Sequence, residues 1–165
     1  MIQVVAGDLA REAVDAVIRP ADANLAPVGP AAVRLDELGG VRFAAQRRTA
    51  TPLEAGAAVV TGAGDLTAGY VLHVVIADDR GPAARDRVRR ALVSAWQRAE
   101  DWGLARIATG LVGVANGQLS VEASAALLVE TFPRGADGAR GMELRIVVEA
   151  GAERDEVEAI VRRMT

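Results

Sequence analysis

The stretch that decides the fold is residues 56–75, GAAVVTGAGDLTAGYVLHVV. Two apolar runs rich in valine, 57–61 and 70–76, flank the short segment Gly-Ala-Gly-Asp at 62–65. Apolar runs of this kind on either side of a glycine-rich turn predict two antiparallel strands. The sheet of this protein is therefore expected to contain an antiparallel pair.

Outside this hairpin, short apolar runs alternate with segments of helical period. Strands are expected at 2–6, 16–18, 106–109 and 142–148. The spacing of the apolar residues predicts helices over 82–102 and from Ser120 onward, and a final helix that contains Val157, Ile160, Val161 and Met164. A further helix start is expected near Pro30. Strands that alternate with helices indicate βαβ units and a sheet covered on both faces. With the hairpin, this pattern predicts an α/β fold around a mixed sheet.

The composition limits the possible classes of protein. A chain of 165 residues and 17.2 kDa is long enough for a single domain over 1–165 with a sizeable core. The absence of cysteine excludes disulfides, thiolate metal ligands and thiol nucleophiles. No apolar run approaches the roughly 18 residues of a membrane span, and the N-terminal residues read as a strand rather than a signal peptide. We therefore expect a cytoplasmic protein that does not bind membranes.

The charge argues against nucleic acid as a partner. The formal net charge is −3 and the isoelectric point is near 5.3, whereas nucleic-acid-binding domains usually carry a basic face. Metal and cofactor sites are not expected either, because one histidine and no cysteine argue against a zinc site.

Two loops are expected to form a ligand site. Open α/β sheets bind ligands beyond the carboxyl ends of their strands, and loops 19–30 and 110–120 leave such ends and lead into helices. The unpaired N–H groups and the positive dipole end of each helix favour an anion. Glycines in both loops would let the backbone approach that anion closely. The residues alone thus predict a phosphate-like ligand that bridges the two loops.

The sequence also resembles a known family. Residues 4–22, VVAGDLAREAVDAVIRPAD, resemble the opening of a macro domain, and residues 56–75 are very similar to the second signature of that family. The resemblance covers nearly the whole chain and implies a three-layer αβα macro-like fold with a central mixed sheet of about six strands. Macro domains bind ADP-ribose, and some hydrolyse ADP-ribosyl groups or O-acetyl-ADP-ribose.

The resemblance implies roles for two neighbouring residues near the N-terminus. Asp8 matches the aspartate that accepts a hydrogen bond from the adenine amino group, and Leu9 matches the neighbour whose backbone meets the ring. On local grounds Asp8 is also a helix cap after a glycine turn. Asp8 can both cap the helix and accept a hydrogen bond from adenine.

The first loop departs from the family pattern. The two family asparagines fall on Arg19 and Asp22. Asp22 can accept from the hydroxyls of the distal ribose but cannot donate as an amide does; alternatively, Asp22-Ala23-Asn24 is an ordinary turn. Arg19 either offsets the negative charge of Asp22 or simply lies on the surface. Gly29 is the glycine that remains, between Val28 and Pro30, and Pro30 lacks an N–H donor.

The second loop keeps the family length but loses its threonine, its middle glycine and its aromatic residue. The resemblance implies a phosphate cradle made by Gly113, Val114, Ala115, Asn116 and Gly117. A plain strand-to-helix crossover is the competing interpretation. His73, the only histidine, lies between apolar neighbours at a position that is structural in the family, so no catalytic residue is assigned.

The sequence therefore predicts a protein that binds ADP-ribose or a related nucleoside diphosphate, without efficient catalysis. Two alternatives remain at this point. One is an ADP-ribosyl or O-acetyl-ADP-ribose hydrolase, and the other is a macro fold that has lost its ligand and serves protein–protein contacts.

Overall fold

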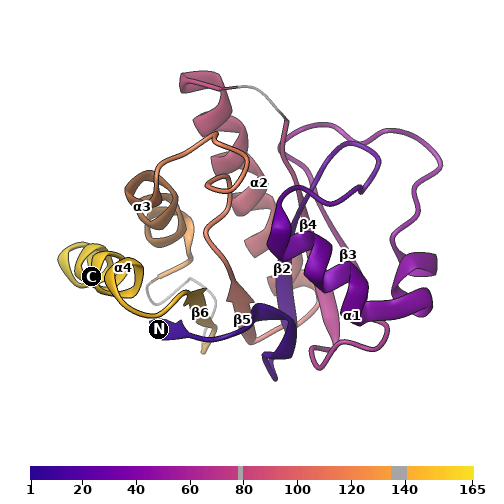
Figure 1. Cartoon of the computed structure of the whole chain (residues 1–165). Helices are drawn as coiled ribbons and strands as arrows, with labels where there is room; N and C mark the ends of the chain where they lie inside the picture. The colour runs from indigo at the N-terminus through magenta and orange to yellow at the C-terminus, as the bar shows by residue number, and fades with distance from the viewer. Residues whose placement is uncertain (78–79, 135–140) are drawn as a thin grey trace.

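The computed structural model describes residues 1–77, 80–134 and 141–165. Within these ranges one six-stranded sheet has the order β1-β6-β5-β2-β4-β3 (Figure 1). Its strands are β1 (Ile2–Ala6), β2 (Ala16–Ala21), β3 (Ala58–Gly62), β4 (Tyr70–Val75), β5 (Arg106–Thr109) and β6 (Glu143–Val148). Only β3 runs antiparallel to its neighbour, β4, and the other pairings are parallel. The mixed sheet and its hairpin are confirmed.

Helices cover both faces of this sheet. A single turn of 3₁₀-helix, η1 (Leu9–Arg11), follows β1, and the α-helices are α1 (Pro30–Gln46), α2 (Pro82–Asp101), α3 (Val121–Thr131) and α4 (Ala152–Met164). The apolar residues of α2, α3 and α4 share one core cluster, whereas η1 and α1 bury theirs in another on the opposite face. The three layers that the resemblance implies are therefore present (Figure 1).

The periodic patterns place the helices well. The buried residues of α2 include Val88, Leu92 and Ala95, and Ser120 caps α3 by accepting a hydrogen bond from the N–H of Ala123 at 3.1 Å. Helix α2 ends one residue before Trp102, which is 53% exposed and packs edge-on against Tyr70 at 5.5 Å.

Strand β2 is longer than expected, because it continues through Arg19 and Pro20 to Ala21. A proline in a central strand removes a ladder hydrogen bond. Here β5 pairs with β2 only at Ala16 and Val17, so the ladder on that side has already ended when the chain reaches Pro20. The first loop therefore starts at Asp22 rather than at Arg19.

The parallel strands bring their carboxyl ends to one edge of the sheet. The segments after β1, β2, β4, β5 and β6 all leave from this edge. Among the helices of the described ranges, none combines the length and the apolarity that a membrane crossing requires.

Candidate functional site

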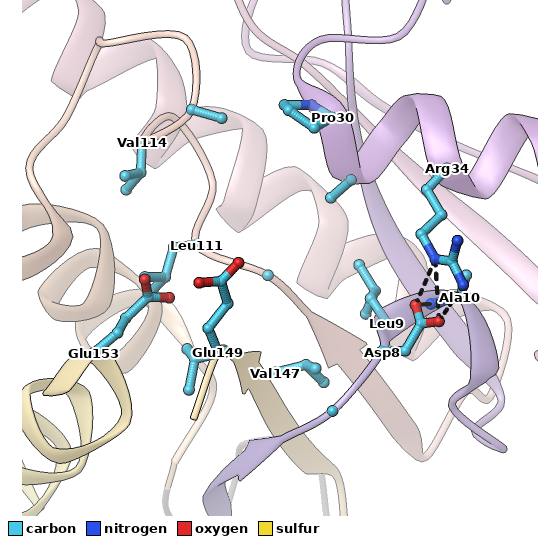
Figure 2. Close-up of a pocket in the computed structure, with 15 residues that line it drawn as sticks. Asp8, Leu9, Ala10, Pro30, Arg34, Leu111, Val114, Val147, Glu149 and Glu153 are labelled. Atoms are coloured by element: carbon cyan, nitrogen blue, oxygen red, sulfur yellow. Dashed lines mark hydrogen bonds and ion pairs between the residues drawn. The ribbon is translucent and has the colours of Figure 1, made fainter. Parts of the chain in front are cut away.

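A cavity of about 460 Å³ opens at the carboxyl-end edge, between β1 and the segments that follow β5 and β6 (Figure 2). Its size is within the range of small-molecule sites. Four segments form its wall, and they contribute Gly7, Asp8, Leu9 and Ala10; Pro30, Ala31 and Arg34; Gly110, Leu111, Val114 and Ala115; and Val147, Val148, Glu149 and Glu153.

A second cavity of about 280 Å³ lies at the ends of β2 and β4. It is lined by Asp22, Pro27, Val28, Ile76, Ala77 and Asn116. The two ligand loops meet between the cavities, since a Cβ placed on Gly29 would lie only 3.2 Å from the Cβ of Ala115. Gly29 has a φ of 93°, a backbone conformation that side chains other than glycine rarely adopt. We call the two cavities the chambers of one crevice, because Pro30 and Ala115 line the larger and their neighbours Val28 and Asn116 line the smaller, with the close approach of Gly29 to Ala115 between them.

Asp8 lies in the wall of the larger cavity and caps η1. Its Oδ1 accepts from the N–H of Ala10 at 3.1 Å, so the helix-cap interpretation of Asp8 is confirmed. Leu9, beside it, is buried in the apolar layer under α1 and forms the floor next to Asp8. The adenine contact that the resemblance implies for these two residues stays a prediction.

The carboxylate of Asp8 is held by an arginine that the sequence analysis missed. Arg34 of α1 donates from Nε to both oxygens at 3.1 Å and from Nη2 to Oδ2 at 2.6 Å. The hydrogen bond from Arg34 is the main reason that the pKa of Asp8 falls below its ordinary value, although partial burial opposes it. Arg34 lies one helical turn after Pro30, and this i, i+4 spacing was the signal for a second residue facing the crevice.

The first loop is folded tightly against the end of β2. The Oδ1 of Asp22 accepts from the N–H groups of Asn24 at 2.8 Å and of Ala26 at 2.9 Å. The N–H of Val28 donates to the carbonyl of Pro20 at 3.0 Å. Through these bonds the side chain of Asp22 stabilises a turn, which is one of the two interpretations given for this residue. Asp22 also lines the smaller cavity.

The second loop distributes its residues between the two chambers. Val114 and Ala115 line the larger cavity and Asn116 lines the smaller one. Gly113 and Gly117 line neither cavity and have positive φ values of 84° and 76°. The guanidinium of Arg80 lies against Gly117, since a Cβ on that glycine would be 3.4 Å from Nη2. Three of the five predicted cradle residues thus line the cavities, a cation lies beside Gly117, and the phosphate cradle stays a prediction.

The expectation that Arg19 lies on the surface is wrong, and so is the idea that it offsets the charge of Asp22. Arg19 is completely buried and donates from Nε and Nη2 to the two oxygens of Asp36 on α1, at 2.7 and 2.9 Å. Its Nη1 also donates to the carbonyl of Leu25 at 3.0 Å. A buried guanidinium needs a charged partner and hydrogen bonds to each of its edges, and α1 supplies the charged partner. No sequence motif marks this pair, because its members lie on different elements.

His73 is buried at the centre of β4 and lines neither cavity, so its structural role is confirmed. Its ring stacks on Phe43 at a centroid distance of 5.8 Å.

The wall opposite Asp8 carries two carboxylates that were also missed. Glu149 follows β6 directly and Glu153 lies in the first turn of α4 (Figure 2). The residues that line the two cavities include no aromatic side chain. In the part of the chain that the structure describes, no group of three or more His, Cys, Asp or Glu residues is arranged to hold a metal ion.

The sequence and the fold match known proteins. The family model for the Macro domain matches residues 18–128, which is more than half of the chain. An uncharacterized protein of Mycobacterium tuberculosis is 26% identical over 133 residues, and the match covers 81% of this chain but 37% of that protein. An uncharacterized protein of Aeropyrum pernix is 29% identical over 185 residues, covering 99% of this chain and 95% of that protein.

Solved structures of macrodomains have a similar fold. The Oceanobacillus iheyensis macrodomain with ADP superimposes with a TM-score of 0.84 at 13% identity, covering 98% of this chain and 90% of that one. The Trypanosoma brucei macrodomain gives a TM-score of 0.84 at 20% identity, covering 97% and 66% respectively. At these identities the likeness shows a common fold.

Proposed function

This chain belongs to the macro domain family, and we propose that it binds an ADP-ribose-like nucleotide across the two chambers at the carboxyl ends of its strands. The observation that carries the proposal is the pair of adjoining cavities, with Asp8 in the wall of one and Asp22 in the wall of the other. A solved structure of similar fold contains ADP, and a variant of the same macrodomain was solved with ADPR. The chain spans about 37% of the length of its mycobacterial relatives, so the proposal concerns this domain.

The shape of the crevice suggests how such a ligand would lie. The larger cavity, with its apolar wall of Leu9, Leu111 and Val147, would take the nucleoside. The smaller cavity would take the second ribose, whose hydroxyls can donate to Asp22. The diphosphate would then cross between the chambers at Gly29 and Ala115, which must separate to admit it.

The charges near this crossing point support an anion there. Helix α1 begins at Pro30, which has no N–H, and the N–H of Val33 donates to the carbonyl of Gly29, so the N–H groups of Ala31 and Ala32 and the positive dipole end remain for an anion. Arg80 adds a full positive charge beside Gly117. The two glutamates lie on the far wall of the larger cavity, where they disfavour an anion and leave room for the uncharged part of the ligand.

We infer that the domain does not hydrolyse its ligand efficiently. Asp22 stands where the family has an asparagine and cannot donate as that amide does, and its Oδ1 holds the turn of the first loop through two backbone N–H groups. Arg19, at the position of the other family asparagine, is withdrawn into the core by Asp36.

The contact between Gly29 and Ala115 also favours a second candidate function. If the loops stay closed, the crevice admits no dinucleotide-like ligand, and the domain serves protein–protein contacts instead. The two functions differ in a measurable way, namely whether a ligand that spans both chambers binds.

Calorimetric titration with ADP-ribose tests the proposal. The exposed Ala115 is changed to Glu to place a carboxylate where the diphosphate would cross, and Ala45→Glu adds the same charge at an exposed position of α1 outside both cavities. We expect saturable binding to the wild type and to Ala45→Glu, with at least a roughly tenfold weaker constant for Ala115→Glu.

Two results would contradict the proposal. The absence of heat with ADP-ribose, ADP and AMP at millimolar concentration would favour the protein-contact function. Release of ADP-ribose from a modified protein, or of acetate from O-acetyl-ADP-ribose, above background would overturn the inference about catalysis.

A further inference from the structure

Asp8 and Arg34 both line the larger cavity, and the guanidinium of Arg34 occupies the carboxylate of Asp8. A ligand in this cavity therefore meets an arginine paired with an aspartate and not a free carboxylate. The Oδ1 of Asp8 accepts from the N–H of Ala10 and from Arg34 Nε, both at 3.1 Å. Its Oδ2 accepts from Arg34 Nη2 at 2.6 Å and from Arg34 Nε at 3.1 Å, and Arg11 Nε forms an ion pair with it at 3.4 Å. A carboxylate offers about four acceptor sites. The protein's own groups therefore saturate Asp8.

Saturation changes what this corner of the cavity can recognise. A ligand that presents an N–H donor at this corner must displace Arg34 from a two-pronged, charge-assisted contact, which is the strongest class of hydrogen bond in proteins. A ligand that presents an acceptor can instead receive a hydrogen bond from Arg34 while the contact with Asp8 stays in place. The contacts with Asp8 use the Nε–H and one N–H of Nη2, and a guanidinium carries five N–H groups.

The position of the pair makes this relevant to a ligand. Both side chains belong to the wall of the larger cavity, and neither is fully buried, with 29% of Asp8 and 46% of Arg34 exposed (Figure 2). The apolar residues Leu9 and Val147 line the same chamber and suit the faces of a flat ring. The Asp8–Arg34 pair would then form hydrogen bonds with the edge of such a ring.

We propose that Arg34 sets the base specificity of this site, so that the cavity prefers a carbonyl acceptor at the 6-position of a purine, as in a 6-oxopurine, over an amino donor at that position, as in adenine. The inference rests on the proposed nucleotide-binding function and refines it. Arg34 acts here in two ways, because it removes the acceptor that an amino group needs and supplies donors that a carbonyl can use.

The experiment compares ADP with inosine diphosphate, which differ at the purine edge and share the ribose and both phosphates. Each is titrated calorimetrically against the wild type and Arg34→Met, which keeps an unbranched apolar stem and removes the guanidinium. Arg42→Met is the matched control, because Arg42 lies on the same helix and pairs with Asp65 at 2.6 Å outside both cavities. Thermal melting verifies that both variants are folded.

For the wild type and Arg42→Met we expect the dissociation constant of inosine diphosphate to be about tenfold lower than that of ADP. A factor of about ten is what one hydrogen bond to a charged, partly exposed group contributes to affinity. In Arg34→Met the carboxylate of Asp8 is released, so the preference should disappear or reverse. Equal affinities in the wild type, a preference for ADP, or an unchanged ratio in Arg34→Met would overturn the inference and leave the proposed function standing. If neither nucleotide nor ADP-ribose binds to any of the three proteins, the proposed function fails and the inference fails with it.

Discussion

Arg19 Nη1 lies 3.2 Å from Nδ1 of His73, its direct partner across the β2–β4 ladder. Arginine has no acceptor, so Nδ1 of His73 must be the unprotonated nitrogen and the ring hydrogen must be on Nε2. Nε2 then donates to Thr61 Oγ1 at 2.8 Å, and the Thr61 hydroxyl donates to the carbonyl of Gly62 at 3.0 Å. The chain of bonds from Arg19 to Gly62 fixes His73 in one neutral tautomer.

This relationship predicts a specific pH dependence of stability. Burial, with the nearby charges of Arg19 and Arg47, lowers the pKa of His73 to about 3, whereas an unfolded histidine titrates near 6.5. Between these values the unfolded chain binds one more proton than the folded one. The free energy of unfolding should therefore fall as the pH drops from about 6.5, by up to about 1.4 kcal/mol per unit for this group.

Urea unfolding of the wild type and His73→Gln between pH 7 and 5 isolates this effect, because carboxylates contribute little in that window. We expect the variant to have the flatter profile. A nitrogen-detected NMR spectrum showing a His73 ring that titrates near 6.5, or carries its hydrogen on Nδ1, would contradict the prediction.

Arg19→Met should destabilise the fold by about 3 kcal/mol, because it leaves Asp36 without its main partner in a site where the carboxylate is only 11% exposed. Arg47, at 3.7 Å from Asp36, replaces part of the lost attraction. In the double variant Arg19→Met/Asp36→Leu the loss should be clearly smaller than the sum of the single losses. A double-mutant cycle from denaturant unfolding measures this coupling, and additive single effects would contradict it.

The hairpin turn depends on Gly64. Its φ is 59°, and a Cβ there would lie 2.5 Å from the carbonyl oxygen of Gly39 and 2.6 Å from the nitrogen of Phe43. Gly103 has a similar φ of 66° with no atom within 4 Å of the same Cβ position, so it provides the control. Gly103→Ala should cost about 1 kcal/mol from backbone strain alone, and Gly64→Ala about 2 kcal/mol more from overpacking. If thermal or urea unfolding gives the same loss of stability for the two variants, a Cβ at position 64 does not clash with α1.

Arg80→Ala should weaken the binding of phosphate-bearing ligands and leave nucleosides unaffected. The guanidinium lies against Gly117, next to the proposed path of the diphosphate. Loss of one charged contact predicts about tenfold weaker binding of ADP. Arg106→Ala, an exposed change at the opposite edge of the sheet, is the control. A matched loss for adenosine would assign Arg80 a role in loop structure instead.

The parts of the fold that the sequence predicts well are those where a local period decides the structure. Strand β5 has the bounds expected from its apolar spacing, and α2 differs by one residue. The extension of β2 through Arg19 and Pro20 was not predictable in this way. Those residues disfavour a central strand locally, and they are accommodated by Asp36 and His73, which come from elsewhere in the chain.

The same distinction between local patterns and tertiary contacts applies to the candidate site. The second loop follows from its position between a parallel strand and a helix, whereas the resemblance to macro domains indicated Asp8. Arg34 and the two glutamates belong to the site because their helices and strand ends point at the same chamber. The pairing of Arg34 with Asp8 depends on how α1 lies over η1, and that orientation is a property of the packed core.

The contact between Gly29 and Ala115 has a consequence for binding rates. A mononucleotide can occupy the larger chamber while the loops remain in contact, so its association should follow a simple bimolecular course. A ligand that spans both chambers has to wait for the loops to separate, and its association rate should level off at high concentration at the rate of loop opening. The crevice would thereby distinguish its ligands by how quickly they enter as well as by how tightly they are held.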